Sequence, residues 1–307
     1  MTQAPIPPEI VPDLERVDQI VAERATTRPV VAGIAAQHLA PEEGRLRAAI
    51  VLLAARLGDY ALERAAHAAA SVELIAAASG VHDELVDEAE RRRGTVGSEP
   101  RWGGGAALMV GDYLLALSAA EMALTPDPQI IAYYSRSLMA ICEGQMAPVT
   151  VVAPLEQARE QYLYRIGCVS ASLFASAAAA GGVCGGLRQD QVDALEQFGH
   201  ELGLALQITA DARDYTGAGR ALRAGIITLP LIYAVHAGGP QLAERLDAPA
   251  DDATVRATLD EVQRLGGVER ARADAAAHAA RARAHLASLP PGAARDALAA
   301  ITDAAVS

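Results

Sequence analysis

Apolar residues recur at intervals of three and four positions along most of the chain, and alanine fills many of these positions. Runs of β-branched residues are short. A spacing of three and four places side chains on one face of an α-helix, whereas a half-buried strand alternates with a period of two. Alanine also has the highest intrinsic helix propensity. We therefore predict an all-α protein.

The helices are expected between Gly- and Pro-containing segments, because these residues interrupt helices. The predicted helices cover residues 12–24, 43–57, 60–87, 106–124, 126–145, 189–215 and 226–236. Residues 216–225 are expected to form a short turn, and residues 268–305 two surface helices separated at 289–295. The whole chain, residues 1–307, is interpreted as one domain, with N-terminal helices in 1–38 and peripheral C-terminal helices in 264–307.

The least polar stretch, within residues 155–186, is long enough to cross a bilayer. Alanine, glycine and serine contribute little transfer energy to insertion, and no basic flank orients the segment. We interpret it as the central, tightly packed helix of a bundle and predict no transmembrane span.

Charge and composition exclude several functions. The 307 residues are 51% hydrophobic, which is enough for a large core, and the net charge is −12. No basic face for phosphate backbones is visible, so nucleic acid is not an expected partner. All 26 basic residues are arginine, which excludes lysine Schiff bases and Walker-type loops. Three scattered cysteines indicate no disulfide framework, as is usual in the cytoplasm.

Acidic and basic residues gather at the end of the predicted helix 60–87. Asp83 and Asp87 are four residues apart and share one helical face. Two carboxylates one turn apart suit Mg²⁺, which also takes water and substrate phosphates. Arg92 and Arg93 follow, and guanidinium groups suit phosphate oxygens. The alternative is a solvated, charged helix end.

A second acidic pair, Asp211 and Asp214, ends the predicted helix 189–215. Antiparallel helices would bring these carboxylates opposite Asp83 and form a cation site above an apolar interior. The alternative is an ordinary solvated helix end. Arg45 and Arg47 precede another apolar helix and are candidates for binding a second anion.

Several segments in register resemble the trans-isoprenyl diphosphate synthases, the polyprenyl synthetase family, over most of the chain from about Leu39 onward. They read GRLR at 44–47, VELIAAASGVHDELVDEAERRRG at 72–94, VGDYLLALS at 110–118, EGQ at 143–145, FGHELGLALQITADARDYTG at 198–217 and GIITLPLIYAV at 225–235.

The resemblance implies an isoprenoid-synthase-type helical bundle around a deep apolar cavity, usually a homodimer. It implies Mg²⁺-assisted loss of diphosphate from an allylic isoprenyl diphosphate and attack by isopentenyl diphosphate. By resemblance, Asp83 and Asp87 match metal-binding positions of the family, and Asp211 and Asp214 are further metal candidates. Arg92 and Arg93 match arginines that bind the diphosphates. Arg47, with Arg45 beside it, matches the isopentenyl diphosphate site, and Gln207 matches the glutamine before the second acidic motif. Asp83, Asp87 and Arg92 are the expected catalytic residues.

The departures from the family pattern concentrate on charged positions. The leading aspartate of the second motif is Ala210, and Arg213 lies within that motif. Family lysines fall on Gly44, Val169 and Ile226, and the isopentenyl-site histidine falls on Ala76. A charge-assisted hydrogen bond contributes about 1.5–3 kcal/mol. Several such losses would slow the reaction by orders of magnitude. Arg213 either replaces the missing metal charge or points into solvent.

Two functions therefore remain open. One is a divergent Mg²⁺-dependent prenyltransferase, or a terpene cyclase of the same fold. By resemblance, the small Ala78 and Ser79 before Asp83 would then permit products longer than fifteen carbons. The other is a weakly active or inactive subunit that pairs with and regulates a paralogous prenyl synthase. An α-helical scaffold unrelated to isoprenoids would leave the ordered series of motifs unexplained.

Overall fold

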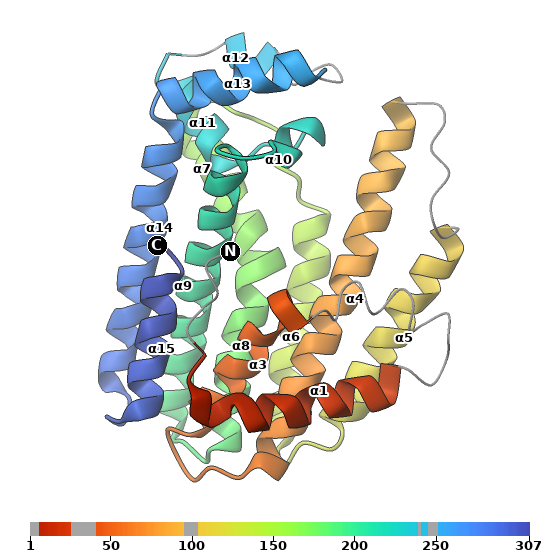
Figure 1. Cartoon of the computed structure of the whole chain (residues 1–307), viewed down its shortest axis with the longest axis vertical. Coiled ribbons are helices and arrows are strands. Elements are labelled where there is room, and N and C mark those ends of the chain that lie inside the picture. Colours follow the sequence, from red (N-terminus) through yellow and green to blue (C-terminus); the bar gives the residue numbers. More distant parts are fainter. Residues whose placement is uncertain (1–5, 26–40, 95–103, 239–240, 245–250) are drawn as a thin grey trace.

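A computed structural model gives the structure of the protein and describes residues 6–25, 41–94, 104–238, 241–244 and 251–307 (Figure 1). The described part consists of helices and their connecting turns and contains no strand, as the apolar spacing predicts. Its main helices are α1 (Val11–Ala25), α3 (Pro41–Ala55), α4 (Leu62–Gly94), α5 (Gly104–Met122), α6 (Pro128–Gln145), α7 (Leu155–Ile166), α8 (Ser172–Cys184), α9 (Gln189–Asp214), α11 (Leu229–His236), α13 (Asp252–Arg264), α14 (Gly267–His285) and α15 (Ala293–Ala304). Short helical turns are η1 (Pro8–Ile10), η2 (Gly167–Ala171), α10 (Arg220–Arg223), α12 (Gln241–Glu244) and η3 (Leu286–Ser288).

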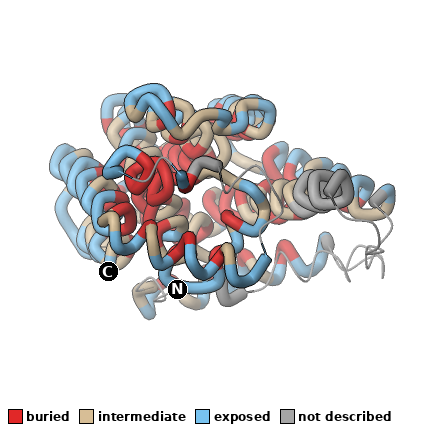
Figure 2. The backbone as a smooth tube through the Cα atoms, turned by 90° about the horizontal axis from the view of Figure 1, so that it is seen from above, coloured by how far each residue is buried: buried red, intermediate tan, exposed pale blue. Residues whose placement is uncertain are grey.

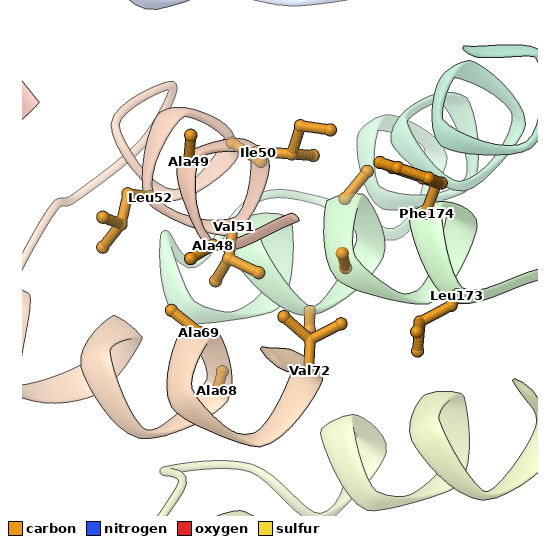
Figure 3. Packing of buried hydrophobic residues seen from close by; sticks show 14 of the residues in the cluster. Ala48, Ala49, Ile50, Val51, Leu52, Ala68, Ala69, Val72, Leu173 and Phe174 are labelled. Carbon is orange, nitrogen blue, oxygen red and sulfur yellow. The ribbon is translucent and has the colours of Figure 1, made fainter. Parts of the chain in front are cut away.

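Helix α8 lies in the interior, in contact with α3, α4, α6 and α9. Its sequence, SLFASAAAAGGVC, has small side chains at most positions, and nearly all of them are buried. Figure 3 shows Ala48 and Val51 of α3 and Ala69 and Val72 of α4 turned toward the neighbouring helix α8. Figure 2 shows buried positions gathered inside the bundle and exposed positions along its outer surfaces.

Glycine lets α8 approach its two neighbours at backbone distance. A Cβ atom on Gly181 would lie 2.3 Å from the carbonyl oxygen of Val51 in α3. A Cβ atom on Gly199 of α9 would lie 2.3 Å from the carbonyl oxygen of Phe174 in α8. Side chains at these positions would therefore push α3 and α9 away from α8.

Residues 155–184 form one continuous helical segment that is not a uniform α-helix. Helices α7 and α8 flank η2, which has π-helical hydrogen bonding over Gly167–Ala171. The wider turn changes the rotation of side chains between the two halves. Residues in and beside η2 reach the acidic end of α9, as described below.

Helix α1 crosses α3 and α4 (Figure 1) and is attached by partly buried ion pairs. The Asp13 carboxylate accepts hydrogen bonds from Arg56, at 2.6 Å, and from the Tyr60 hydroxyl. At the other end, Arg24 lies 2.8 Å from the buried Glu121 of α5, which also contacts His67 of α4 at 2.7 Å. These contacts position the helices that precede the acidic segment.

The C-terminal helices form an outer layer. Helix α14 packs along α9, α15 contacts α3 and α14, and α13 lies across one end of the bundle (Figure 1). The predicted break at 289–295 separates α14 from α15. The expected turn at 216–225 also contains the single-turn helix α10. The first backbone N–H group of α10 donates a hydrogen bond to the Asp214 carboxylate. The sequence also predicts a loop at residues 95–105 that contains Trp102, and residues 95–103 of it lie outside the described residues.

Two helical segments in the described part are long and apolar enough to cross a membrane, Gly105–Met122 and Leu155–Cys184. In the second, 67% of the apolar window is buried inside the bundle, which confirms its predicted place in the core. Only 33% of the first window is buried, so α5 leaves much of its apolar surface uncovered.

The contact between α8 and α3 gives a stability prediction. Gly181→Ala is expected to lower the free energy of unfolding by about 1–3 kcal/mol, because the added methyl group meets the Val51 backbone. The matched control is Gly105→Ala, since a Cβ atom there has no neighbour within 4 Å. It is expected to be neutral or stabilising by up to about 1 kcal/mol. Urea unfolding measures both, and equal effects would contradict the close packing.

Candidate active site

Asp83 lies on α4 and is linked to α6 and α7 by polar side chains. Its carboxylate accepts a hydrogen bond from the side-chain amide of Gln145, the last residue of α6. The amide oxygen of Gln145 accepts a hydrogen bond from the Arg165 guanidinium of α7, at 3.3 Å. A second nitrogen of Arg165 donates to the Gly144 carbonyl oxygen, also at 3.3 Å. Three helices therefore meet at the Asp83 carboxylate.

Asp211 lies near the end of α9 and has its own set of neutral donors. The Tyr162 hydroxyl of α7 donates to one carboxylate oxygen at 2.7 Å, and Gln207 donates to the other at 2.9 Å. Ser170, in η2, donates to the Gln207 amide oxygen at 2.7 Å. The π-helical turn and α9 thus hold this carboxylate through a chain of hydrogen bonds.

The ionisation of Asp211 reflects its place in the fold. Burial raises the pKa of the Asp211 carboxyl to about 6, although the hydrogen bonds from Tyr162 and Gln207 act to lower it. The nearby charge of Arg165 lowers the same pKa. Arg165 is therefore electrostatically coupled to Asp211 while it is joined to Asp83 through Gln145. Helix α7 contacts both carboxylates' surroundings, because Tyr162 donates to Asp211 and Arg165 donates to Gln145, which donates to Asp83. That Asp83 and Asp211 bind one cation stays a prediction.

Asp214 caps the next helical turn. Its two carboxylate oxygens accept hydrogen bonds from the backbone N–H groups of Arg220 and Ala221, both at 2.9 Å. Its side chain is 12% exposed. The interpretation of Asp214 as a metal ligand is still a prediction, and metal binding would compete with this cap.

The altered second motif lies at the end of α9. Ala210, at the position where the resemblance implies a leading aspartate, is exposed. Arg213 lies at the surface end of α9 and is partly exposed. It donates a hydrogen bond to the backbone carbonyl oxygen of Ser307 at 2.6 Å and so holds the C-terminal residue beside α9.

Arg47 and Arg45 of α3 have different surroundings. Arg47 lies 3.7 Å from a carboxylate oxygen of Glu73 and 5.0 Å from the centre of the Phe174 ring. Burial raises the pKa of Glu73 to about 7, with the Arg47 charge opposing the shift. Arg45 instead pairs with Asp18 of α1. The structure therefore gives Arg45 a role in attaching α1, while its predicted anion binding stays a prediction.

Asp87, Arg92 and Arg93 lie on α4 by their backbone positions. Their side chains are outside the described residues. Asp87 follows Asp83 by one helical turn, and the two arginines fall within the last turn before Gly94. Their assignments as metal and diphosphate ligands are still predictions.

Sequence analysis missed three side chains of this polar region: Gln145, Tyr162 and Arg165. The EGQ segment was singled out by resemblance only, and no pattern pairs Gln145 with Asp83. Tyr162 resembles any apolar position of an amphipathic helix. Arg165 lies four residues before Val169, and in a regular α-helix this spacing places two residues on one face.

The donor set fits a magnesium ion that retains water and binds substrate phosphates. Asp83 and Asp211 supply hard oxygen donors from two helices, and their hydrogen-bond partners named above are mostly neutral. Within the described part of the chain, no three His, Cys, Asp or Glu side chains cluster as a complete cage. Mg²⁺ needs no such cage, because it is commonly bound by one or two carboxylates plus phosphate oxygens.

Two adjoining cavities of about 510 and 740 Å³ lie beside η2 and α9. They share Leu163, Tyr164 and His200. Among the predicted site residues whose side chains the structure describes, none lines either cavity. The deep apolar cavity implied by the resemblance stays a prediction.

The described residues form an all-α bundle, which is the fold of the isoprenoid synthases. The chain also matches the polyprenyl synthetase family over residues 29–264. It therefore belongs to the polyprenyl synthetase family, whose members are prenyltransferases.

Similar proteins include heptaprenyl diphosphate synthase component 2 of Geobacillus stearothermophilus, with 34% identity covering 84% of each chain. Nonaprenyl diphosphate synthase of Mycobacterium tuberculosis is 32% identical and is covered over 91% of its length and 95% of this chain. Among solved structures, a polyprenyl synthase from Caulobacter crescentus CB15, complexed with calcium and isoprenyl diphosphate, has 31% identity and a TM-score of 0.88. That match covers 97% of this chain and 95% of the other.

The shifted ionisation of Asp211 predicts a pH effect on stability. Its pKa is about 6 in the folded state and 3.8 as the ordinary value, so between these values the folded state binds the extra proton. Raising the pH through this window therefore costs folded-state stability at this group. In Asp211→Asn this cost is absent. We expect the melting temperature of the variant, minus that of the wild type, to rise by a few degrees from pH 4 to pH 7 without metal.

The control for this experiment is Asp190→Asn. Asp190 pairs with Arg188 on the surface, and that hydrogen bond lowers the pKa of Asp190. Its difference curve is expected to be flat or to have the opposite slope. A flat difference curve for Asp211→Asn would contradict the burial of this carboxylate.

Proposed function

We propose that this protein is a Mg²⁺-dependent trans-prenyltransferase of isoprenoid biosynthesis that acts in the cytoplasm. It binds an allylic isoprenyl diphosphate between the ends of α4 and α9 and transfers the prenyl group to isopentenyl diphosphate or another acceptor. The observation that carries the proposal is the polar region that joins Asp83 to α7 and Asp211 to η2. The named relatives, which are long-chain prenyl diphosphate synthases, support the same reaction class.

Each polar side chain has a proposed part in the reaction. Asp83, Asp87 and Asp211 hold Mg²⁺, which when bound neutralises charge on the departing diphosphate. Gln145 orients Asp83, while Tyr162 and Gln207 orient Asp211. Arg92 and Arg93 bind diphosphate oxygens, and Arg47 binds the second substrate beside Phe174. The fixed orientation of these groups reduces the reorganisation needed when the carbon–oxygen bond breaks.

The apolar helices protect the allylic cation. Small buried side chains from α3, α4 and α8 form the interior next to the polar region. Such surroundings exclude the water that would otherwise capture the cation. Ala78 is fully buried and Ser79 is partly buried on α4, before Asp83. Their small volume supports a product longer than fifteen carbons.

Asp83→Ala tests the metal site. We expect the rate of diphosphate release from labelled geranyl, farnesyl or geranylgeranyl diphosphate, with Mg²⁺ and isopentenyl diphosphate, to fall about 100-fold or more. The control is Asp190→Asn, which removes an exposed carboxylate remote from the site and is expected to retain the wild-type rate. Equal rates for the wild type and Asp83→Ala would contradict the assignment.

A second function, a regulatory subunit, is favoured by Ala210 and by the absence of lysine from the chain. The relatives from G. stearothermophilus and Bacillus subtilis are each described as one component of heptaprenyl diphosphate synthase. In this case the purified protein would bind allylic diphosphate without turnover and would shift the product length of a paralogous synthase on mixing. Turnover by the protein alone would exclude the regulatory function as its main one.

We also propose that a second subunit of the same fold covers α5 and α6. Large apolar side chains are exposed on α5, α6 and α7 and directly after α5 and α6. They are Leu108, Met109, Leu124, Ile131, Met139, Met146 and Tyr164. Exposed large apolar side chains that gather on neighbouring helices are typical of an interface. The partner is a second copy in a homodimer or a paralogue in a heterodimer.

The double substitution Met109→Asp and Met139→Asp tests this interface. The exposed fractions of these side chains are 60% and 58%, so the monomer tolerates both changes, whereas buried charges disfavour association. We expect the sedimenting mass to shift from dimer to monomer. Ala257→Glu, on the exposed face of α13, adds charge elsewhere and is expected to leave the mass unchanged. A wild-type protein that is monomeric alone but dimeric with a paralogue would indicate the heterodimer.

A further inference from the structure

Arg165 is a cation with unusually weak partners. Its guanidinium donates to the Gln145 amide oxygen and the Gly144 carbonyl oxygen, both at 3.3 Å. Charge-assisted hydrogen bonds to anions are usually about 2.7–2.9 Å long. Among the described residues, no carboxylate lies within ion-pair distance of Arg165, whereas Arg159 on the same helix pairs with Asp274 at 3.1 Å. An anionic acceptor would therefore replace the present partners of Arg165 at little cost.

Arg165 lies on α7, which contacts the partners of both acidic helices. Its guanidinium donates to Gln145, which in turn donates to Asp83 of α4. Tyr162, three residues earlier on α7, donates to Asp211 of α9. The side chain is partly buried, so solvent screens its charge less than at the surface. A diphosphate held by metal at these carboxylates would meet the guanidinium at close range.

The adjoining helical geometry supports the same conclusion. Arg165 precedes the π-helical turn η2 by two residues, and π-helical turns occur frequently at functional sites. A Cβ atom on Gly144 would lie 2.7 Å from the Val169 side chain and 3.2 Å from the Arg165 backbone oxygen. Residues 165 and 169 thus both face the end of α6, so a cation at 165 reaches the region that a side chain at 169 would reach.

We propose that Arg165 is a diphosphate-binding residue of this protein, which on substrate binding exchanges Gln145 and Gly144 for phosphate oxygens. This proposal rests on the proposed function and adds to it a cation from α7, supplied by a residue that the resemblance did not point to. The exchange frees the amide oxygen of Gln145 from Arg165, while the amide nitrogen of Gln145 still donates to Asp83. Arg165 would thus supply a cation in a region where the chain, which has no lysine, lacks the positive charge at position 169.

The test uses Arg165→Gln and inorganic diphosphate as the probe, with Mg²⁺, in isothermal titration calorimetry. Loss of a charge-assisted contact predicts a dissociation constant about tenfold or more above that of the wild type. The matched control is Arg136→Gln on α6, because Arg136 is exposed and pairs with Glu196 at 3.2 Å. The control is expected to bind as the wild type does.

The outcomes separate this proposal from the proposed function. If the wild type binds diphosphate and Arg165→Gln binds equally well, the role of Arg165 is overturned and the proposed function stands. If the wild type does not bind diphosphate with Mg²⁺, both are overturned. Circular dichroism checks the fold of the variant. If Arg165→Gln unfolds, Arg165→Met keeps more of the apolar stem and is measured in its place with the same expected loss.

Discussion

The close approach of α8 to α3 and α9 is the constraint on which the rest of the structure depends. The contacts at Gly181 and Gly199 bring helix backbones together where any Cβ atom would overlap a carbonyl oxygen. This packing fixes the rotation and depth of the segment from α7 through α8. Because α7 and η2 continue directly into α8, the same constraint places Tyr162, Arg165 and Ser170 against the acidic ends of the neighbouring helices.

The polar region built on this frame has mostly neutral hydrogen-bond donors around its carboxylates. Asp83 receives an amide N–H from Gln145, and Asp211 receives a hydroxyl and an amide. Neutral donors orient the oxygens without cancelling their charge, so the carboxylates keep most of their attraction for a cation. The burial of Asp211 works in the opposite direction, since it favours the protonated form until a cation is bound.

The fold was predictable from the sequence because helix periodicity and Gly/Pro boundaries are local signals. The expected helix at 189–215 agrees with α9, Gln189–Asp214, to within one residue. Side-chain pairing between distant segments has no such local signal. The hydrogen bond from Gln145 to Asp83 joins residues 62 positions apart, and nothing in either segment specifies the other. The cap formed by Asp214 was not predicted for a different reason. The glycines after α9 indicate a turn, and the four-residue helix α10 within it is too short to have a recognisable periodicity.

The wider turn at Gly167–Ala171 affects how this protein can be matched to its relatives. Each residue in an α-helix advances the rotation by about 100°, so one extra residue within a turn displaces every later side chain by a comparable angle. A gapless alignment with a chain that lacks this wider turn therefore pairs residues whose side chains point to different neighbours on one side of the turn. Transferring residue roles along this segment requires superposed backbones, with its two halves fitted separately.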